Sequence, residues 1–426
     1  MIRSRLVTWR CLLTSAIAGV AGGCSWQDTL VDGTFTPAQW QDLQSSLAFR
    51  PPTNPENICF NAGLTESQCG NAVALGSQVF NDPRVSGDGS VSCATCHAMP
   101  TWADPRTANN VSLGAEGKWT KRNALTLWDE GYKLELHGKF GWDGAYTTPG
   151  QVIERALTPM AGSIPELLQL LQNDGNYAML YEGAFGVAPG EDLSFTQHVE
   201  QAFTAYMSGP PFISAATPFD HYLQGDDTAI SASAKRGFAV FVGRGTCIEC
   251  HSGPLFTDLQ PHDTGVPQEG PHVPSTDVGA GSGAFFAPTL REIASTGPYM
   301  HDGYFATLSQ VINFYRTGGA GYNDYTGTRD PRIQPLDLTD QDALDLEAFL
   351  DSLSQGTSGS GSGSGMPPPP PPDAPVAPDA FSSCGPGFEQ CALGGCVDVQ
   401  VDPMNCGACE HMCQPPTPVC YQGNCQ

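Results

Sequence analysis

Apolar side chains recur at intervals of three and four along much of the chain, and this period predicts amphipathic helices. The clearest example follows Thr339, which has the spacing to cap a helix together with Asp342. The apolar positions of that segment are Leu346, Phe349, Leu350 and Leu353. Further helices are expected at 165–171 and at 308–315, the latter ending before Gly318 and Gly319. The pattern therefore predicts a mainly α fold.

A weak internal repeat accompanies these helices. Gly76 and Phe80 lie four residues apart in one helical stretch, and Gly237 and Phe241 lie four apart in another. Each stretch precedes a Cys-x-x-Cys-His sequence. Two related domains in tandem explain this repeat.

The composition changes sharply after Leu353. A Gly/Ser run at 356–365 and a proline run at 367–372 predict a flexible coil that passes into a stiff spacer. Beyond it, eight of the sixteen cysteines crowd into 384–425, which predicts a small module with up to four disulfides. Cys59 and Cys69 are a further expected bridge. Residues 402–409 resemble the stigma-specific type of cysteine-rich repeat, which implies a structural or adhesive role.

The amino terminus has the pattern of an export signal. Three arginines precede an apolar stretch at 11–20 that is too short to span a bilayer. The run Ala21-Gly22-Gly23-Cys24 resembles a bacterial lipoprotein processing site, in which Cys24 becomes a lipid anchor. Simple cleavage and release is the alternative. We therefore expect a signal peptide at 1–23, a lipid anchor at Cys24 and a location in the periplasm or cell envelope.

The chain is strongly acidic, with 44 Asp and Glu against 19 Lys and Arg and a net charge of -25. Such a field repels nucleic acids and anionic membrane surfaces. We therefore expect no nucleic-acid partner.

Two Cys-x-x-Cys-His motifs carry the chemistry, at Cys93, Cys96 and His97 and at Cys247, Cys250 and His251. In this motif two thioethers attach a c-type haem, and the histidine supplies an axial nitrogen to the iron. The alternative is a four-thiolate zinc site, but zinc leaves both histidines unexplained. The motifs therefore predict two covalent c-type haems.

Residues 82–97, around the first motif, resemble the first haem site of the bacterial dihaem cytochrome c peroxidase and MauG family. The resemblance continues in four later segments, at 122–126, 142–144, 287–291 and 298–303. It implies two tandem cytochrome c domains, with a peroxidatic haem in 27–215 and an electron-transfer haem in 216–354. A flexible linker at 355–382 and the disulfide-rich module at 383–426 follow. The implied partners are hydrogen peroxide and a small electron-donor cytochrome or a protein substrate.

The resemblance also implies roles for single residues. Trp142 matches the tryptophan that lies between the haems, and Asn123, Thr296 and Pro298 match the ligands of a calcium ion. Tyr315, fourteen residues after His301, matches the second axial ligand of the His251 haem in MauG-like proteins. The alternatives are a core role for Tyr315 and ligation by Met300.

The chain departs from the family where peroxide cleavage needs a base and a proton donor. Arg155 stands where the family has Gln, and Pro165 stands where it has Glu. The nearest acids are Glu154 and Glu166. Either could take over the role of the missing Gln or Glu; the alternative is that both are exposed helix residues. A peroxide-using oxidoreductase is the first hypothesis. The alternatives are a non-catalytic dihaem electron carrier and a surface-binding protein that acts through its tail.

Overall fold

The computed structural model describes residues 30–51, 55–106, 110–190, 194–320 and 328–355, together with four short strands near the C-terminus. The chain forms two compact units, Met1–Ser362 and Gly363–Gln426. In the second unit, β3 (Phe388–Gln390) pairs with β4 (Cys396–Asp398), and β5 (Cys420–Tyr421) pairs with β6 (Asn424–Cys425), both antiparallel. The predicted signal peptide with Cys24, most of the linker and the side chains of the cysteine-rich module lie outside the described residues.

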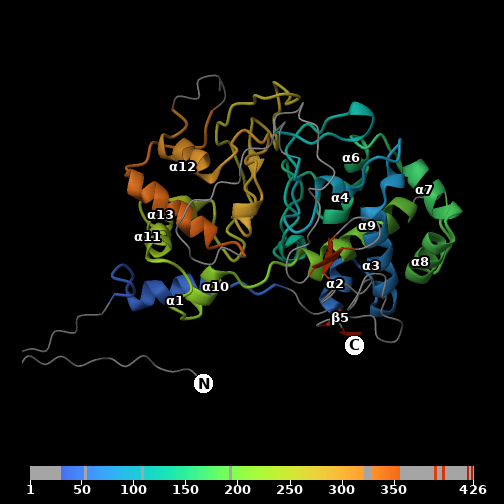
Figure 1. The fold of residues 1–426 in the computed structure, drawn as a ribbon, viewed down its shortest axis with the longest axis horizontal. Helices are drawn as coiled ribbons and strands as arrows, with labels where there is room; N and C mark the ends of the chain where they lie inside the picture. Colours follow the sequence, from blue (N-terminus) through green and yellow to red (C-terminus); the bar gives the residue numbers. More distant parts are fainter. Residues whose placement is uncertain are drawn as a thin grey trace, which may run out of the picture. The chain divides into compact units, whose positions relative to one another are not determined.

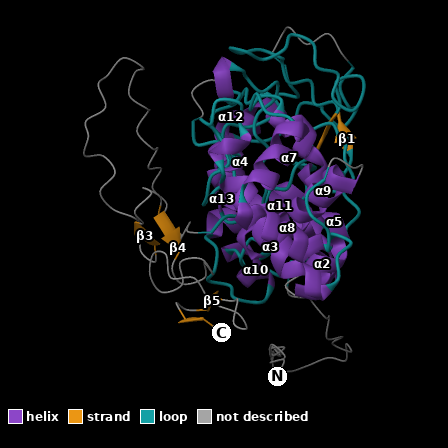
Figure 2. Ribbon diagram, turned by 90° about the vertical axis from the view of Figure 1, so that its right-hand side faces the viewer, coloured by secondary structure: helices purple, strands orange, loops and turns teal. Residues whose placement is uncertain are grey.

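The first unit is mainly helical, as Figure 2 shows. Its α-helices are α1 (Pro37–Ser46), α2 (Pro55–Asn61), α3 (Glu66–Asn81), α4 (Cys93–Cys96), α5 (Glu130–Glu135), α6 (Ile153–Leu157), α7 (Ile164–Asn173), α8 (Gly175–Phe185), α9 (Ser194–Met207), α10 (Pro218–Leu223), α11 (Ala232–Val242), α12 (Leu308–Arg316) and α13 (Asp340–Asp351). Short 3-10 helices include η5 (Pro210–Phe212), η6 (Cys247–Glu249) and η7 (Ile293–Ser295), and β1 (Pro261–His262) pairs antiparallel with β2 (Phe285–Phe286). Across the described ranges, every helix is too short or too polar to cross a membrane.

The three helices expected from apolar periodicity are confirmed. Thr339 and Asp342 cap α13 reciprocally, because Thr339 Oγ1 donates to the Asp342 carboxylate (2.7 Å) and the Asp342 amide donates back to Thr339 Oγ1 (3.2 Å). The helix α12 ends two residues before Gly318, which has a φ of 62° that favours glycine. The third expected helix lies within α7.

Two hydrophobic clusters organise this unit. The first lies among α3, α7, α8 and α9, and the second among α10, α11, α12 and α13, on opposite sides of the body in Figure 1. Gly76 and Gly237, the glycines of the sequence repeat, occupy equivalent positions in the two clusters. A Cβ on Gly76 would lie 2.4 Å from the Ala202 carbonyl oxygen in α9, and one on Gly237 would lie 1.8 Å from the Asp345 carbonyl oxygen in α13. Glycine is therefore required where each helix pair comes into close contact.

The amino-terminal segment packs against the second hydrophobic cluster, although it precedes the residues of the first cluster in the chain. Phe35 and Leu47, which flank α1, belong to the second cluster rather than the first. Trp40 of α1 lies edge-on to Tyr222 of α10, with ring centroids 5.1 Å apart. The helix α1 therefore packs its partly buried residues Trp40 and Leu43 against residues of the second cluster.

The expected bridge between Cys59 and Cys69 is present as a disulfide with an S–S distance of 1.97 Å. It joins α2 to α3 within a separate, smaller hydrophobic cluster that includes Ala72 and Ala205. Cys93, Cys96, Cys247 and Cys250 form no disulfide, so the thiols of both Cys-x-x-Cys-His motifs are available for attachment chemistry.

Candidate active site

The first Cys-x-x-Cys-His motif forms the short helix α4, which starts at Cys93 and ends at Cys96. His97 follows, and its Nδ1 lies 3.3 Å from the carbonyl oxygen of Trp102. Trp102 is itself held, since its Nε1 donates to the Pro211 carbonyl (2.8 Å). Burial lowers the pKa of His97, so the neutral imidazole is favoured. The contact at Nδ1 leaves Nε2 as the nitrogen that can bind iron.

The second motif has the same local arrangement. Cys247 begins η6, and Nδ1 of His251 lies 3.0 Å from the carbonyl oxygen of Phe256, again five residues further along the chain. Burial also lowers the pKa of His251. In both motifs a backbone carbonyl five residues further along the chain thus orients the histidine ring through Nδ1, as is usual for histidines that bind a metal through Nε2.

An apolar cavity opens beside the second motif. Its walls include the thiols Cys247 and Cys250 and the imidazole of His251. The apolar lining includes Phe241, Leu290, Ile293, Leu308, Ile312, Leu346 and Leu350. Two thiols and one oriented imidazole in an apolar chamber are the donor set that a covalently attached haem requires, so these residues fit the group.

Tyr315 and Met300, the two candidates for a second axial ligand, both line this cavity. Burial, and after it the thiols of Cys250 and Cys247, raise the pKa of the Tyr315 phenol. The phenol is therefore close to the attachment cysteines as well as buried. The fold brings Tyr315 into the cavity of His251, although 63 residues lie between them in the chain.

The same cavity reaches the residues expected between the haems. Trp142 Nε1 donates to the carbonyl oxygen of Asn123 (2.9 Å), and the Asn123 amide donates to the carbonyl oxygen of His301 (2.8 Å). The side chain of Asn123 meets the carbonyl oxygen of Pro298, with Nδ2 at 2.6 Å. Thr296 lines the cavity as well. The fold therefore assembles Trp142 and the three residues expected to hold calcium in one place.

The residues considered for peroxide cleavage lie outside the cavity of the second motif. Arg155 Nη1 makes an ion pair with Asp143 (2.9 Å), whose carboxylate also pairs with Arg122 (2.8 Å). Glu154 is exposed, and Glu166 is an exposed residue near the start of α7 that accepts a hydrogen bond from Ser163 Oγ (2.8 Å). None of Arg155, Glu154 and Glu166 lines the described cavity.

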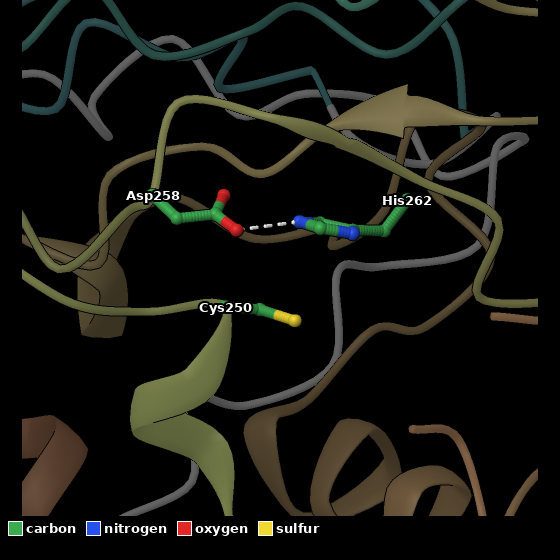
Figure 3. Close-up of side chains that lie close together, drawn as sticks. All are labelled: Cys250, Asp258 and His262. Carbon is green, nitrogen blue, oxygen red and sulfur yellow. Dashed lines mark hydrogen bonds and ion pairs between the residues drawn. The ribbon is translucent and has the colours of Figure 1, made fainter. Parts of the chain in front are cut away.

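Sequence reasoning missed a polar cluster beside the second motif, which Figure 3 shows. The side chains of Cys250, Asp258 and His262 have their ligand atoms within 4.8 Å of one another. A hydrogen bond with the Cys250 thiol, followed by the charge of that thiol and of Asp258, raises the pKa of His262 to about 9. A thioether at Cys250 carries no charge, so haem attachment removes the largest of these effects and leaves no thiolate for a metal ion.

The sequence assigned no role to His301, a buried residue that lies between Phe285 and Trp142. Its ring stacks on Phe285 at 3.6 Å and lies edge-on to Trp142 at 6.5 Å. Burial lowers the pKa of His301 to about 4, and Nε2 has no hydrogen-bond partner among the described residues. Only the three-dimensional contacts reveal this neutral imidazole next to Trp142.

Comparisons with known proteins agree with this geometry. The family profile described as di-haem cytochrome c peroxidase matches residues 70–228. The cytochrome-c peroxidase IdrP1 of Denitromonas iodatirespirans is 33% identical over 318 residues, 66% of this chain and 81% of the relative. The methylamine utilization protein MauG of Methylorubrum extorquens is 34% identical over 351 residues, 79% of this chain and 93% of the relative.

Among solved structures, that of a MauG-like protein associated with microbial copper homeostasis has 28% sequence identity and a TM-score of 0.58. The match covers 72% of this chain and 93% of that chain. The family implies two c-type haems, in agreement with the two motifs and their oriented histidines. This chain therefore belongs to the dihaem cytochrome c peroxidase and MauG family.

Proposed function

We propose that this protein is a dihaem c-type cytochrome oxidoreductase that reduces hydrogen peroxide or uses it to oxidise a protein or small substrate. The peroxide-facing haem is attached at Cys93 and Cys96, and the electron-transfer haem at Cys247 and Cys250. In the reaction, one peroxide takes up two electrons and two protons and leaves as two waters.

One observation carries this proposal: the cavity that contains the second attachment site continues to Trp142 and Asn123, residues of the half that carries the first motif. Bound haems supply one-electron chemistry at iron. The chain orients both axial histidines, surrounds the second site with apolar side chains that exclude water, and places an oxidisable indole between the halves.

We further propose Tyr315 as the second axial ligand of the His251 haem. Its supports are its burial in the cavity of His251 and its closeness to both attachment thiols. Met300 lines the cavity too and is the rival ligand. A phenolate favours the ferric and higher oxidation states of iron more than a thioether does, so this haem would store an oxidising equivalent.

A calcium ion between the two sites is also part of the proposal. Asn123, Pro298 and Thr296 line one cavity, and the Asn123 side chain meets the Pro298 carbonyl directly. An amide turned so that Oδ1 faces this carbonyl would give two of the oxygen ligands that calcium prefers.

The remaining organisation is proposed from the sequence. It comprises tandem cytochrome domains, a signal peptide with a lipid anchor at Cys24, a location in the periplasm or cell envelope, and a stapled C-terminal module on a flexible linker. Export also provides the oxidising surroundings in which the module's disulfides would persist.

A haemochrome assay and peroxide titration of the purified holoprotein test the function. We expect two haems per chain and a high-spin ferric signal that changes when peroxide is added. One haem per chain, or zinc in place of iron, would refute the haem assignment. Two low-spin irons that do not react with peroxide would instead support the non-catalytic electron carrier.

A further inference from the structure

The residue five positions after the histidine differs between the two Cys-x-x-Cys-His motifs. It is Trp102 after His97 and Phe256 after His251. Both residues have a positive φ, 52° and 53°, a backbone conformation that is unfavourable for bulky side chains. In each motif this strained residue brings its carbonyl oxygen to Nδ1 of the histidine, at 3.3 and 3.0 Å. The two residues therefore share a backbone role, and only their side chains differ.

This difference changes the redox chemistry that is available next to each histidine. An indole loses one electron far more easily than the phenyl ring of phenylalanine does. The first motif, to which the proposed function assigns the reaction with peroxide, has the oxidisable side chain, Trp102. The second motif, to which it assigns electron transfer, has the inert one, Phe256. The oxidisable ring is therefore present at the site where the oxidising equivalents would arise.

The indole of Trp102 is buried among aromatic rings, with only 3% of the residue exposed. It stacks on the ring of Phe212, with centroids 4.1 Å apart and an interplanar angle of 29°. Phe80 and Trp128 lie at steep angles to it, with centroids 6.2 and 6.4 Å away. The stacked phenyl ring presents its electron-rich face to the indole, so it would stabilise a positive charge there.

The hydrogen bond of the indole determines what happens to its proton. Nε1 of Trp102 donates to the carbonyl oxygen of Pro211 (2.8 Å). A peptide carbonyl is too weak a base to take this proton, but its partial negative charge stabilises a positive ring more strongly in a buried site than in water. Loss of one electron would therefore leave an indole cation radical that keeps its N–H. Such a radical can be reduced again without any proton transfer.

We propose that Trp102 is a redox-active residue that holds one oxidising equivalent at the first motif when peroxide reacts there. One electron passes from the indole to the oxidised site of His97, and no bond of the indole breaks. This electron is one of the two that reduce peroxide to two waters, and the two protons come from solvent. The one-electron donor of the proposed function later returns an electron to Trp102.

This inference rests on the proposed function and adds a second tryptophan to it. Trp142 lines the cavity of the second motif and is the proposed bridge between the sites. Trp102 is instead joined to His97 through its own backbone carbonyl. The two indoles therefore have separate tasks: one conducts electrons between the sites, and the other stores an equivalent at the first.

The test uses the full-length holoprotein, mixed with one equivalent of peroxide in the absence of an electron donor and frozen within milliseconds. Electron paramagnetic resonance detects the radical, and deuterated tryptophan narrows its signal if the unpaired electron is on an indole. We expect this signal in the wild type, its loss in Trp102→Phe, and its persistence in Trp128→Phe and Trp142→Phe. Trp128 is the matched control, because it packs against Trp102 but none of the described contacts joins it to His97.

A second measurement needs no substitution and decides the matter if Trp102→Phe fails to accumulate. After repeated additions of peroxide to the wild type, peptide mass spectrometry locates the oxidised tryptophan. We expect the product at Trp102, although Trp128 is less buried. Oxidation at other tryptophans with none at Trp102 would overturn the proposal.

Two spectroscopic results would also overturn it. In one, the haem spectra change with peroxide but no indole radical forms, which leaves the proposed function intact. In the other, the signal is lost in Trp142→Phe and kept in Trp102→Phe. Haem spectra that do not respond to peroxide at all would contradict the proposed function, and this inference with it.

Discussion

Replacing Trp142 by Phe tests whether the indole carries electrons between the two haem sites. The substitution keeps an aromatic ring in the cavity but removes the easily oxidised indole and its Nε1–H donor. In the structure that donor makes a 2.9 Å hydrogen bond with the carbonyl oxygen of Asn123. A carbonyl left without its donor in a buried site costs about 1–3 kcal/mol. This cost is a fraction of the roughly 5–15 kcal/mol that holds a typical domain folded, so the variant should fold.

The expected functional effect is larger than the effect on stability. With the indole removed, peroxide should still react at the His97 haem, while oxidation of the His251 haem should slow by about tenfold or more, a barrier increase of at least about 1.4 kcal/mol. Stopped-flow spectroscopy with one equivalent of peroxide follows both haems. Thermal unfolding of the same sample measures the loss of stability.

Trp128→Phe is the matched control. The Nε1 of Trp128 is buried with no hydrogen-bond partner among the described residues, and Trp128 does not line the cavity that contains Trp142. This variant therefore loses an indole without losing a hydrogen bond or the bridge. If the His251 haem of Trp142→Phe is oxidised at the wild-type rate, or if its oxidation slows equally in Trp128→Phe, electrons take another route.

Three further predictions concern the ligands and one buried acid. Tyr315→Phe should change the low-spin spectrum of the His251 haem and raise its reduction potential, while Met300→Leu should change neither; reversed effects would make Met300 the ligand. Removal of calcium by a chelator should alter the haem spectra or the sharing of electrons, and unchanged spectra in a calcium-free sample would count against the site. Burial raises the pKa of Asp129 to about 6, so the stability that its protonated form contributes is complete below about pH 4 and is lost as the pH rises through about 6. Asp129→Asn should therefore flatten the fall in unfolding temperature over that range, and an unchanged pH profile would exclude Asp129 as its source.

The sequence alone determined the features that depend on neighbours along the chain. The cap of α13 needs Thr339 and Asp342, three residues apart, and the end of α12 needs the glycines that follow it. The two attachment motifs are equally local, since two cysteines and a histidine within five residues define the haem chemistry. Hydrogen bonds and side-chain periodicity over one helical turn are visible in a sequence because the geometry of the helix fixes which residues meet.

The tertiary structure decided which distant residues share a site. It packs α1 against α10, encloses Tyr315 with His251, and brings Arg332 to His262 across 70 positions of the chain. These contacts depend on how apolar faces are buried together, and no local pattern records which face meets which. The tripeptide Asp-Pro-Arg occurs at 82–84 and at 104–106 with the same hydrogen bonds between Arg and Asp, yet Arg84 pairs with the distant Asp174 whereas Arg106 contacts Cys96. Local chemistry therefore follows from sequence spacing, whereas the composition of a site follows from long-range packing.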